Sequence, residues 1–129
     1  GLIQAYITAH EANDVMAEFV DPLSAALADL QKSTTWLMQN ALSNPDDAGA
    51  ASTPYLYIMG LVSLAFMWAK IAEAALVALA NEPDEPAFYE NKLRTGRYFC
   101  SHMLPETRIH RTRIEAGSAN LMELDAAAF

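Results

Sequence analysis

The sequence has few of the residues on which disulfide-linked and turn-rich folds depend. It contains one cysteine, Cys100, and only 5 glycines in 129 residues. A single thiol excludes a disulfide within the chain and suits a reducing compartment, so we expect a cytoplasmic protein. Scarce glycine argues against tight-turned β architecture, and no stretch alternates apolar and polar residues with the period of two that marks a strand.

Basic residues are also few, with 8 Lys and Arg against 16 Asp and Glu, which gives a net charge of −8. An acidic chain repels phosphate backbones, so nucleic acid is disfavoured as a partner. The length suits one compact domain. The hydrophobic fraction of 53% is rich in alanine, which favours packed helices. The chain starts with Gly1 and not with methionine, from which we expect a piece of a longer protein.

Apolar periodicity and proline placement predict the first helices. One helix is expected over residues 2–11, with a possible continuation to residue 19. A second is expected to begin at Asp21 and Pro22, as N-cap and first helical residue, and to end near Pro45. Its apolar residues recur with the spacing of a one-sided helix; they are Leu23, Leu27, Leu30, Leu37 and Ala41. Residues 46–52 are small and polar and predict a loop.

A third helix is expected over residues 53–80 and is apolar on nearly all sides, which predicts a central buried position or an oligomer interface. A membrane span is disfavoured because residues 55–69 are too few to cross a bilayer and because Lys70 and Glu73 follow them. A fourth helix is expected from residue 84 or 85 to about 104. Its core positions are expected to be Phe88, Leu93, Phe99 and Met103.

Pro105 is expected to kink the fourth helix or to start a new one, and Gly117 is expected to stop the last helical stretch. Short connections between long helices predict an all-α fold. We expect an antiparallel up-and-down bundle of about four long helices, with the last one kinked near Pro105.

Residues with catalytic or metal-binding potential do not form a recognisable motif. His102, Glu106 and His110 share one helical stripe, but the Glu-x-x-His repeats of a di-iron bundle are missing, so no metal site is predicted. Cys100 lacks a nucleophile motif and is interpreted as a buried structural thiol. No glycine-rich phosphate loop is present.

The most suggestive polar feature is a run of basic residues in the last third of the chain. Its members are Lys92, Arg94, Arg97, Arg108, Arg111 and Arg113. Such a run could contact an anion, for example a nucleotide or a coenzyme A phosphate. The simpler interpretation is that these side chains pair with the acidic first half of the chain or remain solvated.

A set of short segments resembles the helical domain that follows the main flavin module in bacterial acyl-CoA dehydrogenases. Within that family, the chain most resembles the subgroup of enzymes that act on 3-methylmercaptopropionyl-CoA. The segments are 33–37 (STTWL), 53–56 (TPYL), 60–62 (GLV), 92–99 (KLRTGRYF), 103–107 (MLPET), 114–119 (IEAGSA) and 121–125 (LMELD), with Trp68 between them. The resemblance covers residues 20–129, and residues 1–19 are expected to be the end of the flavin module or a linker from it.

The resemblance implies a parent enzyme that uses FAD to remove a proton and a hydride from adjacent carbons of an acyl-CoA. The family's glutamate base and FAD contacts match no residue here, so no catalytic or cofactor-binding residue is assigned to this fragment. The domain is expected to support the upstream flavin module and the subunit contacts of a homo-oligomer, with acyl-CoA bound by the parent. The alternative is a free-standing helical bundle that binds an anionic ligand or a protein partner.

Overall fold

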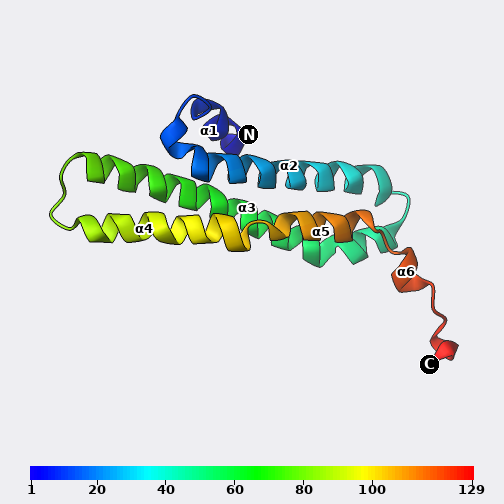
Figure 1. Cartoon of the computed structure of the whole chain (residues 1–129). Helices are drawn as coiled ribbons and strands as arrows, with labels where there is room; N and C mark the ends of the chain where they lie inside the picture. Colours follow the sequence, from blue (N-terminus) through cyan, green and yellow to red (C-terminus); the bar gives the residue numbers. More distant parts are fainter.

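The computed structural model describes all residues, 1–129, and is 82% helical with no strand. Three rods lie side by side (Figure 1): α2 (Ala17–Asn40), α3 (Pro45–Ala80), and α4 (Pro86–Tyr98) followed end to end by α5 (Glu106–Glu115). Successive rods run antiparallel, and α1 (Leu2–Ala9) packs on the outside of α2. The predicted all-α bundle is confirmed, with the fourth helix divided into α4 and α5.

The start of α2 differs from the prediction. Asp21 does not cap the helix; Asn13 precedes a short 3₁₀ turn at Asp14–Met16, and α2 begins directly after it. Pro22 therefore lies inside the helix, where its missing N–H removes only one backbone hydrogen bond. Burial of Phe19 and Val20, which stand before the proline, stabilises this extra turn.

The predicted loop at residues 46–52 is wrong, because α3 starts at Pro45 and includes Pro54. The side chain of Asn44 accepts a hydrogen bond from the N–H of Asp46 at 3.2 Å and so caps the helix. Asp46 and Asp47 then lie in the first turn, where the helix dipole favours negative charge. These capping signals stabilise a helix start nine residues before Pro54.

The junction of α4 and α5 is a π-helical turn at Phe99–Met103, in which the N–H of Leu104 donates to the carbonyl oxygen of Phe99 at 2.9 Å. Pro105 follows and α5 begins next, so the predicted interruption near Pro105 is confirmed. Gly117 ends the bundle with φ +71, a left-handed conformation that glycine adopts without strain. Beyond it, α6 (Ala119–Met122) and the last residues extend away from the bundle (Figure 1).

The core lies between the three rods. Leu23 on α2, Ile58 and Val62 on α3, and Ile114 on α5 are fully buried. Several small residues of α3 also face inward, which lets the neighbouring helices approach closely; they are Ala65, Ala69, Ala72 and Ala75. On the last rod Leu93 and Phe99 are buried as predicted. Phe88 and Met103 are exposed, so their predicted core positions are wrong.

Candidate functional site

The three histidines occupy separate parts of the bundle. His10 lies at the end of α1, while His102 stacks on Tyr98 and His110 stacks on Tyr57. Glu106 contacts only His110, with 3.8 Å between its carboxylate and Nε2. No three His, Cys, Asp or Glu side chains gather in a group that could hold a metal ion.

Cys100 is buried, as the sequence predicted for a structural thiol. Burial and, to a smaller extent, the nearby Glu18 carboxylate raise the pKa of the thiol to about 11. Near neutral pH the residue is therefore a thiol and not the nucleophilic thiolate. Together with Asp29, Leu104 and Arg108 it lines a cavity of about 150 Å³ between α2 and the last rod.

This cavity does not fit FAD. It is the most enclosed of the five main cavities but also the smallest, and the other four are shallow hollows of about 300–440 Å³. Drug-sized ligands already take pockets of about 300–1,000 Å³, and a dinucleotide needs more. The chain also lacks a glycine-rich turn that would let backbone N–H groups approach a pyrophosphate. No residue of the chain is therefore assigned to flavin binding.

Two residues of the predicted basic run pair with the acidic first half of the chain. Arg97 donates two hydrogen bonds to Glu18, from Nε at 2.9 Å and from Nη2 at 3.0 Å, which joins α4 to α2 and raises the pKa of Arg97. Both side chains are about half exposed, so this pair contributes about 1 kcal/mol at most.

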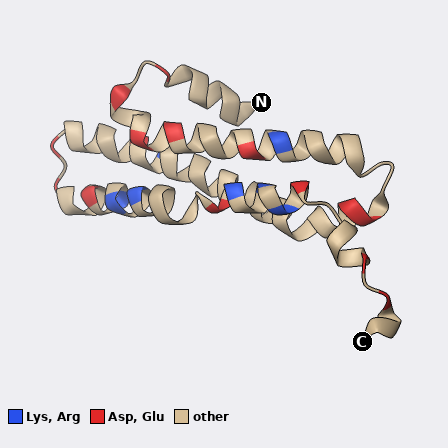
Figure 2. Cartoon of the chain, turned by 45° about the vertical axis from the view of Figure 1, so that its right-hand side comes forward, with Lys and Arg blue, Asp and Glu red and all other residues tan.

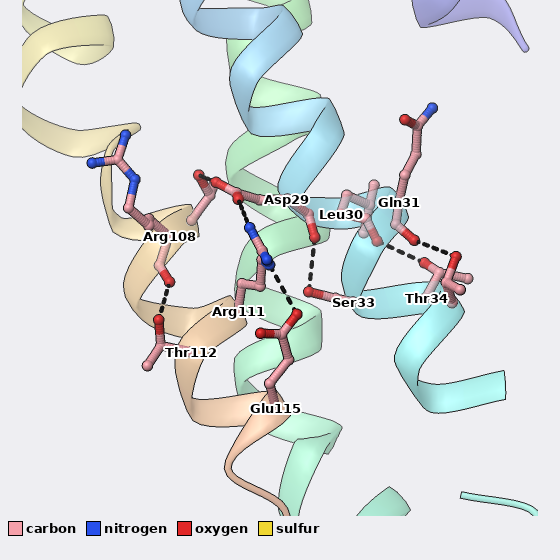
Figure 3. Close-up of polar contacts among 11 residues, drawn as sticks. Asp29, Leu30, Gln31, Ser33, Thr34, Arg108, Arg111, Thr112 and Glu115 are labelled. Atoms are coloured by element: carbon pink, nitrogen blue, oxygen red, sulfur yellow. Dashed lines mark hydrogen bonds and ion pairs between the residues drawn. The ribbon is translucent and has the colours of Figure 1, made fainter. Parts of the chain in front are cut away.

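Arg111 belongs to a more buried network between α2 and α5 (Figure 3). Its Nη1 lies 3.4 Å from Asp29 Oδ1, and its Nε donates to Glu115 at 2.9 Å. The second carboxylate oxygen of Asp29 accepts a hydrogen bond from Thr107 Oγ1 at 2.9 Å. This network was missed by the sequence reasoning; the available signal was an acidic residue, Asp29, between the apolar residues of the α2 stripe.

The other four basic residues are distributed along the surface of the last rod (Figure 2). Lys92 Nζ lies 5.2 Å from the centre of the Phe88 ring, and Arg94 donates to Asn91 at 2.8 Å. Arg108 and Arg113 are exposed. The run therefore forms no single cluster, and the prediction that it contacts an anion stays a prediction.

A polar clasp holds α1 on α3. Tyr6 Oη donates to Glu73 Oε2 at 2.7 Å, and His10 Nε2 lies 3.3 Å from the same oxygen. The other ring nitrogen of His10 lies 2.8 Å from the carbonyl oxygen of Tyr6. Burial and the hydrogen bond to the Glu73 carboxylate raise the pKa of Tyr6 above its usual range. The clasp fixes the N-terminal segment against the bundle.

The side of α3 that points away from the core exposes several large apolar side chains. We define the outer face of α3 as Leu56, Met59, Gly60, Leu64 and Met67. The four large side chains of this face are 45–69% exposed, and Gly60 is exposed among them. No charged residue lies between Asp47 and Lys70. These uncovered apolar residues lie on one side of the helix, with the exposed hydroxyl of Ser63 among them.

The sequence predicted that this helix is apolar on all sides but not which side stays uncovered. By length and composition alone α3 could also cross a membrane, with a mean hydropathy of 1.7 over its most apolar window. Only 28% of that window is buried inside the bundle. The structure shows that α3 has one buried side and one bare side. The predicted central burial therefore holds for one side of the helix, and the alternative, an oligomer interface, stays a prediction.

The fold is that of a helical-bundle domain whose most distinctive surface is an apolar helix face. Residues 1–125 match the family model described as "Acetyl-CoA dehydrogenase C-terminal like". The chain therefore belongs to this family and is a C-terminal domain of the acyl-CoA dehydrogenase type. The family that the sequence motifs suggested is confirmed.

A curated relative supports the same assignment. The chain is 34% identical, over an alignment 145 residues long, to the broad-specificity linear acyl-CoA dehydrogenase FadE5 of Mycobacterium tuberculosis (strain ATCC 25618 / H37Rv). The alignment takes in 94% of this chain but 23% of FadE5, so the chain spans about a quarter of the relative's length.

Proposed function

We propose that this chain is the C-terminal accessory domain of an FAD-dependent acyl-CoA dehydrogenase that oxidises acyl-CoA to 2-enoyl-CoA. Its own role is structural: it supports the flavin module of the same polypeptide and adds subunit contacts in a cytoplasmic homo-oligomer. The flavin module would bind both FAD and the acyl-CoA. Among such enzymes, the motifs most resemble the subgroup that acts on 3-methylmercaptopropionyl-CoA.

The observation that carries this proposal is the outer face of α3. A soluble domain gains about 25 cal/mol for each Å² of apolar surface that it removes from water, so a bare apolar strip is a region where association is favourable. Leu56 is 69% exposed and Met67 is 53% exposed, and no residue of this chain covers them. A docking role uses this surface, whereas catalysis by the domain itself would leave it unexplained.

The polar contacts inside the bundle support the same role. The Asp29 network joins α2 to α5, and the Tyr6–Glu73 hydrogen bond joins α1 to α3. Asp47 Oδ1 accepts hydrogen bonds from the N–H and the hydroxyl of Ser118 at 2.9 and 2.7 Å, which fixes the end of the last rod on α3. A bundle held in this way presents its outer face with little loss of conformational entropy on docking.

The test compares the full-length dehydrogenase with a version that lacks residues 20–129, by light-scattering mass and by acyl-CoA oxidation. We expect the truncated enzyme to change its number of subunits, its activity or both. Met67→Glu in the full-length enzyme should act in the same direction, because it places a charge in the apolar strip. Gln39→Glu on α2, which adds the same charge at a polar site, is the control. An unchanged number of subunits together with unchanged activity after truncation would refute the proposal.

A further inference from the structure

Gly60 has no role within this chain that explains its presence. It lies in the middle of α3, where glycine costs about 0.8–1.0 kcal/mol relative to alanine. A Cβ added at Gly60 would meet nothing within 4 Å, and the residue does not have a positive φ. Neither close packing nor backbone conformation in this chain therefore requires a glycine there.

The two glycines that the fold uses show the contrast. A Cβ at Gly96 would lie 2.9 Å from Phe19 Cε1, so its absence lets α4 approach the core. Gly117 has φ +71 and ends the bundle. Gly60 resembles Gly96 in being surrounded by large apolar side chains, but its neighbours Leu56 and Leu64 flank an empty surface. Nothing in this chain covers the surface at Gly60.

We propose that the outer face of α3 is crossed at Gly60 by an apolar helix from another part of the same dehydrogenase polypeptide, with the two backbones in close approach. This inference rests on the proposed function and specifies its contact. Helix axes pack about 8–10 Å apart depending on the side chains at the crossing, and glycine permits the short end of that range. Leu56, Met59, Leu64 and Met67 would pack around the crossing partner.

Two arguments favour the remainder of the polypeptide as the partner that covers the outer face of α3. The matched relative is more than four times as long as the segment that aligns with this chain, so most of such an enzyme lies outside the bundle. A covalently linked partner also acts at a high effective concentration. A second copy of this domain would instead have to overcome the repulsion between two net charges of −8.

The chain contains its own reporters for the test. Met59 and Met67 belong to the outer face, whereas Met38 on α2 and Met103 in the π-helical turn lie elsewhere and are 70% and 43% exposed. Dilute hydrogen peroxide converts accessible methionine to its sulfoxide, which peptide mass spectrometry quantifies residue by residue. The full-length enzyme is treated, and the four oxidation rates are compared within each sample.

Gly60→Leu is the test variant, because the new side chain has free space in this bundle and leucine is a better helix former. In the wild-type enzyme we expect Met59 and Met67 to oxidise about tenfold more slowly than Met38, equivalent to about 1.4 kcal/mol of protection. In Gly60→Leu the two rates should rise to that of Met38. Gly49→Leu is the matched control, since Gly49 is also on α3 with nothing within 4 Å of its Cβ, and it should leave the protection intact.

Three outcomes would overturn the inference. If Met67→Glu exposes Met59 but Gly60→Leu does not, the face docks without a close crossing at Gly60, and the proposed function stands while the crossing fails. If Met59 and Met67 oxidise as fast as Met38 in the wild-type enzyme, both fail. If their protection disappears on dilution or arises only with lipid vesicles, the occupant is a second copy or a membrane and not the same polypeptide.

Discussion

The two sides of α3 carry equally apolar residues in opposite surroundings. On the inner side Ile58 and Val62 are 0% and 1% exposed and pack against the other rods. On the outer side Leu56 and Leu64 are 69% and 49% exposed and contact no other element that covers them. Hydrophobicity therefore identifies α3 as a helix that must be covered, but it does not separate the side covered by this bundle from the side left for a partner.

The largest expected effect is the loss of stability when one side chain on the inner side of α3 is truncated, compared with the same change on the outer side. Ile58→Ala should lower the free energy of unfolding by about 2–5 kcal/mol, because it removes a fully buried side chain and leaves a cavity. Leu56→Ala should change it by less than about 0.5 kcal/mol, because its side chain is mostly in water. Urea unfolding followed by circular dichroism measures both. Equal losses would mean that Leu56 is packed as tightly as Ile58.

Substitution of one buried and one exposed glycine tests the same difference between covered and bare surfaces. Gly96→Leu should destabilise the chain by about 3 kcal/mol, since its side chain would overlap the buried ring of Phe19. Gly60→Leu should stabilise it by up to about 1 kcal/mol through helix propensity. The shift of the melting temperature should thus have opposite signs in the two variants. A destabilised Gly60→Leu variant would contradict the open surface at that position.

Polar contacts provide a third comparison between inside and outside. Asp29→Ala should cost about 1–3 kcal/mol, because it leaves Thr107 without its partner in a buried position. Glu18→Ala removes the exposed ion pair with Arg97 and should cost about 1 kcal/mol or less. Chemical denaturation at two salt concentrations distinguishes them, because salt screens only the exposed pair effectively. A larger loss for Glu18→Ala would reverse the order.

The last comparison concerns Cys100, which lines the cavity between α2 and the last rod. Its folded-state pKa of about 11 lies above the ordinary value of 9.0, so the thiol contributes stability that is complete below pH 9 and is lost as pH rises through 11. The difference in unfolding free energy between wild type and Cys100→Ala should therefore shrink by about 1 kcal/mol per pH unit in that window. A difference that is constant from pH 8 to 11 would contradict the burial of the thiol.

Much of the architecture was predictable because local signals agreed with the fold. Pro105 and Gly117 interrupt or end helices by their own backbone chemistry, and both do so where predicted. The start of α3 was missed because Pro54 was interpreted as a first helical residue, although the Asn44–Pro45 cap already stood upstream. The start of α2 was missed for a related reason, since Pro22 costs one hydrogen bond and the burial of Phe19 outweighs it.

The candidate site was less predictable than the fold. Arg97 and Arg111 were identified as notable, but their partners Glu18 and Asp29 lie on α2, far away in the sequence. Pairing across such a separation depends on how two helices are rotated about their axes. The anion-binding interpretation of the basic run stays a prediction, as does the boundary between residues 19 and 20.

By itself the sequence determined that the chain is helical and that α3 carries no charge between Asp47 and Lys70, and its motifs resembled those of the acyl-CoA dehydrogenase C-terminal family. The first two properties follow from composition and spacing, whereas the family rests on a resemblance that the match over residues 1–125 confirms. Only the tertiary structure decided which side of α3 is bare and that Gly60 stands within it. The physical reason is that the rotation of a uniformly apolar helix is set by the shapes of its neighbours, here the alanine-rich side that fits against α2, α4 and α5.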